Sequence, residues 1–156
     1  MKITAVETVF PLAEVFTISR GSRTEARVVT VTVERDGITG RGESVPYARY
    51  GETVDGVIAE IMALEGDFAN GLPRMELQSK LAGGAARNAL DCAVWDWEAK
   101  NAGERASVMA GVPHMGPEIT AYTLSLADAD TMRAKAAEHA HRPLLKVKLG
   151  GEGDLA

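Results

Sequence analysis

The chain has 156 residues, 46% of them hydrophobic and 25% charged, a composition typical of one globular domain or of one domain and part of a second. A net charge of −5 leaves no broad basic surface for nucleic-acid phosphates. No apolar run reaches the about 20 residues that a membrane-spanning helix requires, and acidic Glu7 stands where a signal peptide would be apolar. We therefore expect neither nucleic acid nor a membrane as a partner.

The single cysteine, Cys92, excludes a disulfide within the chain and fits a reducing cytoplasm. Its neighbours Leu90, Ala93 and Val94 are apolar. We therefore predict that Cys92 is a buried and inert thiol.

The first part of the chain predicts an antiparallel sheet. Residues 3–11 are rich in β-branched side chains, and residues 27–35 alternate between valine and polar residues. Asp36-Gly37 predicts a hairpin turn that leads into a partner strand over residues 38–44. The alternation predicts a sheet with one face exposed to water.

Two polar segments interrupt this pattern. Residues 16–25 have neither helical nor strand periodicity, and they predict an irregular connection that is long for a hairpin. A second irregular segment is expected over residues 44–52. Loops of this length are either disordered or functional.

Helices are predicted next. Apolar residues recur at helical spacing over residues 54–62, with Thr53 placed to cap the helix. A longer apolar stripe runs over residues 86–97 and predicts a helix that ends near residues 101–103. Several alanines in this second helix indicate close packing against a neighbour.

The pattern changes after residue 112. A strand over residues 118–126, a helix over 128–139 and a strand over 144–149 form a β-α-β unit, which is typical of a parallel sheet or barrel. The sequence thus predicts an α+β domain over residues 1–112. The beginning of an α/β domain follows over residues 113–156.

Two lysines share one face of the last predicted strand. Side chains at positions i and i+2 of a strand point to the same side, so Lys146 and Lys148 are expected to project together. On an exposed edge such a pair is an ordinary solvated face or a guard against aggregation. In a crossover strand covered on both faces, the pair would lie in a polar cavity.

Crowded lysines have a specific chemical use. Desolvation and mutual repulsion favour the neutral amine, which can remove a proton from carbon. The cationic neighbour can stabilise the developing negative charge. Proton abstraction beside a carboxylate by a lysine base, assisted by magnesium, is known from the enolase superfamily.

Four segments resemble the dipeptide epimerases of the enolase superfamily, in its muconate lactonizing subgroup. The first three are residues 19–27 (SRGSRTEAR), 40–52 (GRGESVPYARYGE) and 85–96 (AARNALDCAVWD), and the fourth is the Lys146-Val147-Lys148 strand. The chain is most similar to L-Ala-D/L-Glu epimerases. The resemblance implies a capping domain followed by the first β-α-β segment of a (β/α)8 barrel.

The resemblance also assigns roles to residues. Lys148 would be the acid/base catalyst on one face of the substrate α-carbon, and Lys146 would hold the substrate carboxylate and tune Lys148. A lysine on the opposite barrel wall would serve the other face. Thr123 matches a substrate-contacting threonine, although β-propensity alone also explains a threonine in a strand.

The polar loop matches a flexible loop that closes over the substrate in this family. A guanidinium from Arg23, or from Arg20, would pair with the glutamate side chain of a dipeptide, and the alignment favours Arg23. Either arginine is equally explained as a solvated loop residue. Tyr47 and Tyr50 would belong to a second lid loop, or would simply pack there.

The resemblance further implies Mg²⁺, whose acidic ligands we expect beyond residue 156, as we do the opposing lysine. A complete barrel takes about 250 residues, so we expect the natural protein to be longer and this chain alone to be inactive. The implied protein is a cytoplasmic homo-oligomer that epimerises dipeptides, in recycling of peptidoglycan peptides.

Three alternatives stay open at this point. An N-acylamino acid racemase or a cycloisomerase would share the two-lysine strand without requiring a lid arginine. A catalytically silent capping domain would serve as an interaction module instead.

Overall fold

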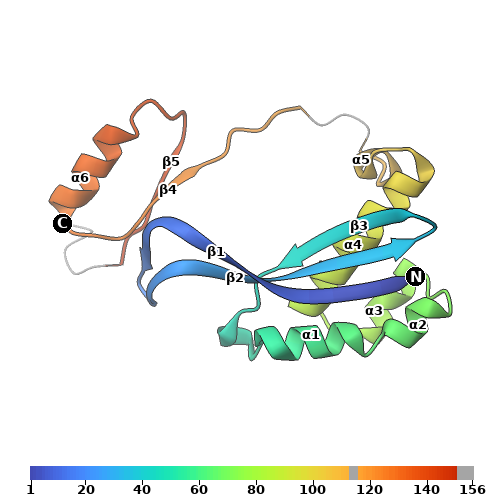
Figure 1. Ribbon diagram of the computed structural model, residues 1–156. Coiled ribbons are helices and arrows are strands. Elements are labelled where there is room, and N and C mark those ends of the chain that lie inside the picture. Colours follow the sequence, from blue (N-terminus) through green and yellow to red (C-terminus); the bar gives the residue numbers. More distant parts are fainter. Residues whose placement is uncertain (113–115, 151–156) are drawn as a thin grey trace. The chain divides into compact units, whose positions relative to one another are not determined.

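The computed structural model describes residues 1–112 and 116–150. They form two compact units (Figure 1). The first unit contains residues 1–9 and 27–112, and the second contains residues 10–26 and 116–150. The predicted domain boundary at residues 112–113 borders residues 113–115, which lie outside the described residues, so this boundary stays a prediction.

A three-stranded sheet with the order β1-β2-β3 begins the chain. Its strands are β1 (Lys2–Ile18), β2 (Gly21–Arg35) and β3 (Ile38–Ser44). β2 and β3 are antiparallel and are joined by Asp36 and Gly37, with φ of 54° and 76°. Positive φ at both positions is what a two-residue hairpin turn requires, and this confirms the predicted turn.

The predicted alternation of β2 is confirmed. Val29, Val31 and Val33 are each 0% exposed, whereas Thr30 and Thr32 are half-buried and Glu34 is exposed. The buried valines belong to one apolar core that is shared with the helices, and its largest members are Ile61, Phe68, Leu77 and Leu90.

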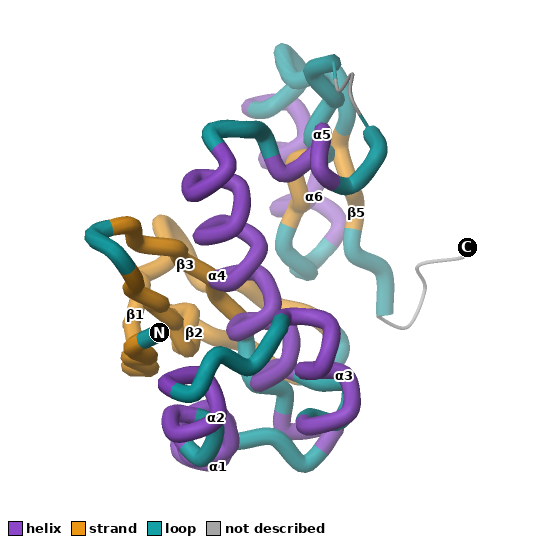
Figure 2. Tube along the Cα trace, turned by 90° about the vertical axis from the view of Figure 1, so that its right-hand side faces the viewer, coloured by secondary structure: helices purple, strands orange, loops and turns teal. Residues whose placement is uncertain are grey.

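Helix α4 (Ala85–Ala102) packs against β3 (Figure 2). A Cβ atom at Gly40 would lie 2.1 Å from the Ala93 carbonyl oxygen, and one at Gly42 would lie 2.1 Å from that of Ala89. The helix backbone therefore approaches the strand where the strand has no side chains. The close packing that the alanines predicted is confirmed.

The remaining helices of the first unit are short. The Thr53 hydroxyl accepts a hydrogen bond from the Gly56 amide at 3.0 Å, which confirms the predicted cap. Helix α4 is followed by the C-cap residue Gly103, whose φ of 67° is left-handed. The remaining helices of the first unit are α1 (Val54–Met62), α2 (Glu65–Ala69), α3 (Leu77–Lys80) and α5 (Ala106–Met109), and its 3₁₀ turns are η1 (Ala48–Tyr50) and η2 (Arg74–Glu76).

The second unit contains the predicted β-α-β segment. Strands β4 (Tyr122–Leu124) and β5 (Leu145–Val147) are parallel, and α6 (Ala129–Glu138) connects them. Both strands are shorter than the sequence predicted. With the antiparallel sheet, this arrangement confirms an α+β capping fold followed by the start of a β/α barrel.

Two predictions are wrong. The irregular loop over residues 16–25 is a tight hairpin, because β1 continues to Ile18 and β2 begins at Gly21. Cys92 is exposed rather than buried, since it lies on the solvent side of α4. Among the residues that the structure describes, no helix is both long enough and apolar enough to cross a lipid bilayer.

Candidate functional site

All five residues predicted to act on the substrate lie in the second unit. Thr123 and Lys146 are directly paired neighbours in the parallel register of β4 and β5. Side chains that are paired in this way point to the same face of a sheet. The structure thus brings together the predicted substrate-contacting threonine and the first lysine of the pair.

The two lysines differ in their surroundings. Lys146 lies within β5 and is exposed, whereas Lys148 follows the end of the strand and is half-buried. Val147, between them, is 50% exposed. The predicted enclosure of the pair stays a prediction, because the described part of this sheet has only two strands.

The predicted arginines lie at the tip of the hairpin formed by β1 and β2. Arg20 belongs to the turn and Arg23 to β2, and both are exposed. The turn also approaches the segment that follows Lys148: a Cβ atom on Gly150 would lie 3.0 Å from the Ser19 Cβ. The arginine-bearing turn therefore lies beside the chain that leaves the lysine strand.

Ser125 attaches this hairpin to the end of β4. Its Oγ accepts a hydrogen bond from the Thr17 amide at 2.6 Å and donates one to the Val15 carbonyl at 3.2 Å. The Leu126 amide donates to the Thr17 carbonyl at 3.0 Å. Sequence reasoning missed Ser125, since its partners lie more than a hundred positions away.

An ion pair makes a second connection in this unit. The Lys135 ammonium of α6 donates to the Glu14 carboxylate of β1 at 2.8 Å. This hydrogen bond lowers the pKa of Glu14 and raises the pKa of Lys135. The hairpin is thus joined to both the strand and the helix of the β-α-β segment.

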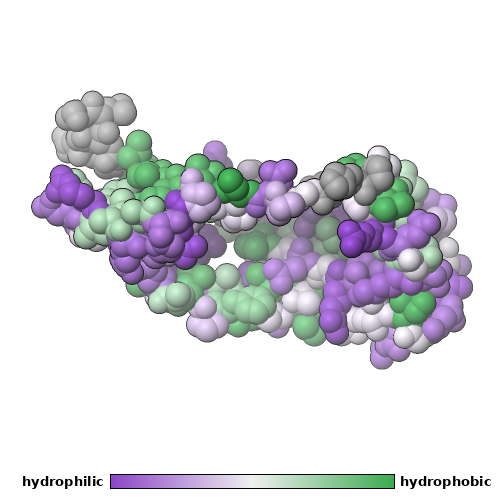
Figure 3. Space-filling view, turned by 90° about the horizontal axis from the view of Figure 1, so that it is seen from above, coloured by the Kyte–Doolittle hydropathy of each residue, from purple (hydrophilic) through white to green (hydrophobic). Residues whose placement is uncertain are grey.

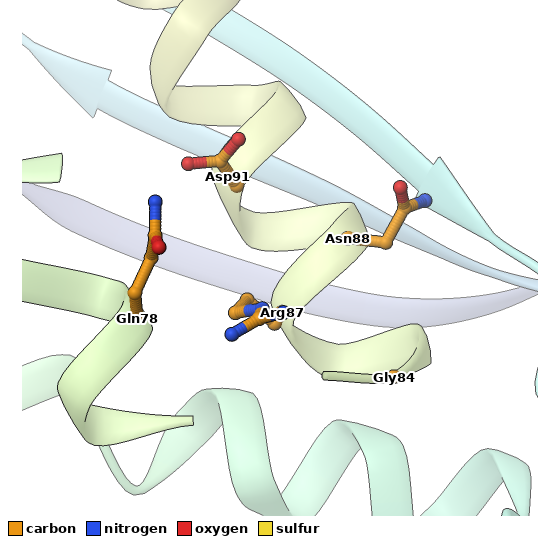
Figure 4. Close-up of a pocket in the computed structure, with 5 residues that line it drawn as sticks. All are labelled: Gln78, Gly84, Arg87, Asn88 and Asp91. Atoms are coloured by element: carbon orange, nitrogen blue, oxygen red, sulfur yellow. The ribbon is translucent and has the colours of Figure 1, made fainter. Parts of the chain in front are cut away.

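A separate polar pocket of about 480 Å³ lies in the first unit, beside α4 (Figure 4). Gln78 extends towards α4, from which Arg87, Asn88 and Asp91 project. The side-chain amide of Asn88 donates a hydrogen bond to the Glu43 backbone carbonyl at 3.1 Å. None of the predicted catalytic residues lines this pocket, so it is not the predicted active site.

The second predicted lid loop lies in the first unit. The rings of Tyr47 and Tyr50 are 5.6 Å apart, and Tyr50 is 76% exposed. The 3₁₀ turn η1 occupies this loop. The tyrosines therefore contact one another at the loop surface instead of entering the core.

The described residues do not provide a magnesium site. Across residues 1–112 and 116–150, no group of three or more His, Cys, Asp or Glu side chains is placed to hold a metal ion. A magnesium ion takes oxygen ligands in near-octahedral geometry. None of these described residues is therefore assigned as a magnesium ligand.

Comparison with known families gives the class of protein. Residues 1–110 match the N-terminal domain of mandelate racemase and muconate lactonizing enzyme. The chain therefore belongs to the mandelate racemase/muconate lactonizing enzyme family of the enolase superfamily.

Particular relatives are dipeptide epimerases. The chain is 46% identical over 145 residues to the L-Ala-D/L-Glu epimerase of Escherichia coli K12, covering 92% of this chain and 45% of that protein. It is thus similar to somewhat less than half the length of that relative.

Two solved structures extend the similarity. An enolase family member from Agrobacterium tumefaciens with homology to dipeptide epimerases, with bound sodium and L-Ala-L-Glu, is 53% identical and has a TM-score of 0.94. The similarity covers 98% of this chain and 47% of that one. The dipeptide epimerase from Enterococcus faecalis, complexed with magnesium and L-Leu-L-Tyr, is 25% identical with a TM-score of 0.81, covering 96% and 45%.

Proposed function

We propose that this chain supplies the capping domain and the first two barrel strands of a magnesium-dependent dipeptide epimerase. Its substrate would be L-Ala-D/L-Glu or a similar dipeptide. The observation that carries the proposal is the pairing of Thr123 with Lys146, two residues before Lys148, in the unit that also holds the arginine hairpin. The similarity to an epimerase that binds L-Ala-L-Glu supports it.

The residues divide the reaction between them. Lys148 removes the proton from the substrate α-carbon. Lys146, two positions earlier, pairs with the substrate carboxylate and stabilises the negative charge that develops there. Thr123, beside Lys146, contributes a hydroxyl to orient the substrate.

The complete reaction needs groups that the described residues do not supply. A protonated group on the opposite face then donates a proton to the same carbon, which inverts its configuration. Magnesium, where bound, supplies further electrostatic stabilisation of the carboxylate.

The hairpin arginines would select the substrate. Arg23 is expected to bind the glutamate side chain bidentately through its guanidinium, with Arg20 in the turn as the neighbouring candidate. The bonds of Ser125 to β1 support this role because they fix the hairpin to the strand that carries Thr123.

Isotope exchange tests the assignment of the base. A polypeptide that carries this chain with the remaining barrel strands is incubated with L-Ala-L-Glu, and separately with L-Ala-D-Glu, in deuterated water, with and without magnesium. Lys148→Ala is expected to abolish α-deuterium incorporation, whereas Lys100→Ala, whose lysine pairs with Asp96 on α4, should leave it intact. Retained exchange at both epimers in Lys148→Ala would remove Lys148 from this role.

Substrate preference tests the arginine separately. Arg23→Met should lower kcat/KM for Ala-Glu far more than for Ala-Leu, since only the first has a side-chain carboxylate. Equal losses for both dipeptides would contradict a carboxylate-binding role. Arg20→Met, measured in parallel, decides between the two arginines.

The cellular setting is part of the same proposal. We infer a cytoplasmic homo-oligomer that acts on peptides released from peptidoglycan. The exposed thiol of Cys92, which forms no disulfide, supports a reducing compartment. Sedimentation of the purified protein measures its assembly.

A further inference from the structure

Glu52 connects two segments of the first unit through one carboxylate. Its Oε1 accepts a hydrogen bond from the Ala85 amide at 2.6 Å, and its Oε2 accepts one from the Tyr47 amide at 2.8 Å. Ala85 is the first residue of α4, and Tyr47 is the N-cap residue directly before the turn η1. Each oxygen of the side chain thus binds a different segment.

The N-cap residue of α4 makes no side-chain cap hydrogen bond of its own. The first amides of a helix have no partner within the helix, and this end of the helix carries partial positive charge. Gly84, at the N-cap position, has no side chain to accept a bond. A Cβ atom there would lie 2.7 Å from the Glu52 Oε1, so glycine gives the carboxylate room to reach Ala85. Glu52 therefore caps α4 from a distant position in the sequence.

The same carboxylate holds a tightly turned loop. The Tyr50 amide donates to the Tyr47 carbonyl at 2.9 Å, and the Gly51 amide donates to that of Ala48 at 3.0 Å. Gly51 has a left-handed φ of 77° that closes the turn. The backbone hydrogen bond between Tyr50 and Tyr47 links the two ends of the turn. A hydrogen bond that holds the Tyr47 amide therefore also restrains the backbone of Tyr50.

We infer that Glu52 is a positioning residue that holds the Tyr47–Tyr50 loop at the N-terminus of α4. Exposed Tyr50 is thereby presented in one place instead of many. The inference goes beyond the proposed function and concerns the first unit alone. The ordering cost of the loop is met when the chain folds, before Tyr50 contacts any partner.

Amide hydrogen exchange tests the connection without requiring activity. In the full chain, Glu52→Ala should speed exchange of the Tyr47 and Ala85 amides by about tenfold or more, because both lose a charge-assisted hydrogen bond. Glu52→Gln should give an intermediate effect, since one amide oxygen remains as an acceptor. Unchanged exchange at both amides in Glu52→Ala would overturn the inference.

Glu60→Gln is the matched control. Glu60 lines the same pocket of about 230 Å³ as Glu52, so this variant removes one negative charge from the same surroundings. It should leave the exchange of Tyr47 and Ala85 unchanged. An acceleration equal to that of Glu52→Ala would mean that charge alone, and not the two bonds, is responsible.

Discussion

Different interactions stabilise each of the two units internally. The first has one continuous apolar core, to which the sheet and several helices contribute. In the described part of the second unit, Leu124 is the single fully buried apolar residue, at 3% exposure, while Leu144 and Leu149 are 48% and 58% exposed. Apolar side chains accordingly reach the surface seen in Figure 3. Hydrogen bonds and an ion pair make the specific connections of the second unit.

The unit that contains most of the apolar core is therefore not the unit that contains the proposed substrate-binding residues. The residues proposed to act on the substrate lie in the unit with little buried apolar area. Segments with few buried contacts open most easily, and binding segments are commonly drawn from them. We therefore expect substitutions in the two units to affect different observables. Trp95 and Trp97, the two tryptophans of the sequence, both lie in α4 and report on the first unit.

The largest effect is expected at Phe68, which is 1% exposed in the core. Phe68→Ala should lower the free energy of unfolding by about 3–5 kcal/mol, because it removes apolar contacts and leaves a cavity. Urea unfolding followed by tryptophan fluorescence measures this loss. Phe10→Ala, at a residue of β1 that is 48% exposed, is the matched control and should change the transition little. An equal loss of unfolding free energy in Phe68→Ala and Phe10→Ala would contradict the proposed difference between the units.

A smaller loss is expected at the contact between β3 and α4. Gly42→Ala should destabilise the first unit by about 1–3 kcal/mol, since the new methyl group would overlap the Ala89 carbonyl unless the helix moves. Gly66→Ala, where nothing lies within 4 Å of the added carbon, is the control. A tolerated Gly42→Ala in the same unfolding assay would show that α4 is free to shift.

Ser125→Ala tests the second unit. Losing the hydroxyl leaves the Thr17 amide without its acceptor and should cost about 1 kcal/mol of local stability. Faster exchange of the Thr17 amide, with an unchanged tryptophan transition, is the expected result. Ser79→Ala removes a hydroxyl that bonds the Glu76 carbonyl in the first unit and should leave Thr17 unaffected. A shift of the tryptophan transition in Ser125→Ala would contradict the independence of the units.

The smallest effect is expected at the exposed pair of Glu14 and Lys135. Hydrogen bonding lowers the pKa of Glu14 in the folded chain, so its contribution is present above the ordinary value of 4.5 and is lost as the pH falls through the lowered pKa. The raised pKa of Lys135 places the other limit in alkali, where the contribution is lost as the pH rises through it. Because both groups are exposed, the net effect should be slight.

Amide exchange of the second unit across the acidic range measures this dependence. Glu14→Gln should remove it. Glu7→Gln is the matched control, because Glu7 makes the corresponding pair with Arg27 in the first unit and its pKa is likewise lowered. If the pH dependence of amide exchange persists in Glu14→Gln, a titratable group other than Glu14 is responsible for it.

Local sequence patterns predicted much of the fold. The alternation of Val29, Val31 and Val33 defined the buried face of β2, and Thr53 and Asp36-Gly37 marked a cap and a turn. These signals succeed because their physical causes lie within a few residues. The hairpin over residues 16–25 was missed because its side chains are mostly exposed on both faces, and its order depends on pairing between strands.

The candidate site was predicted in part. The two lysines and Thr123 follow from strand periodicity and from family resemblance, and the structure places Thr123 beside Lys146. Glu52 and Ser125 carry no such signal, since a glutamate before a helix cap and a serine after a strand are common. Their importance depends on partners brought close only by the fold, as Ala85 is to Glu52.

Because Cys92 on α4 is exposed and is the single cysteine of the sequence, it provides one site for thiol-specific labelling. Partial desolvation and the nearby Asp91 raise the pKa of this thiol. Coupling to a maleimide dye or a spin label is therefore slow at neutral pH and faster in mild alkali, where the thiolate forms. A probe attached there marks the outer side of α4 without any engineered cysteine, and a second probe on the hairpin would allow distance measurements in solution.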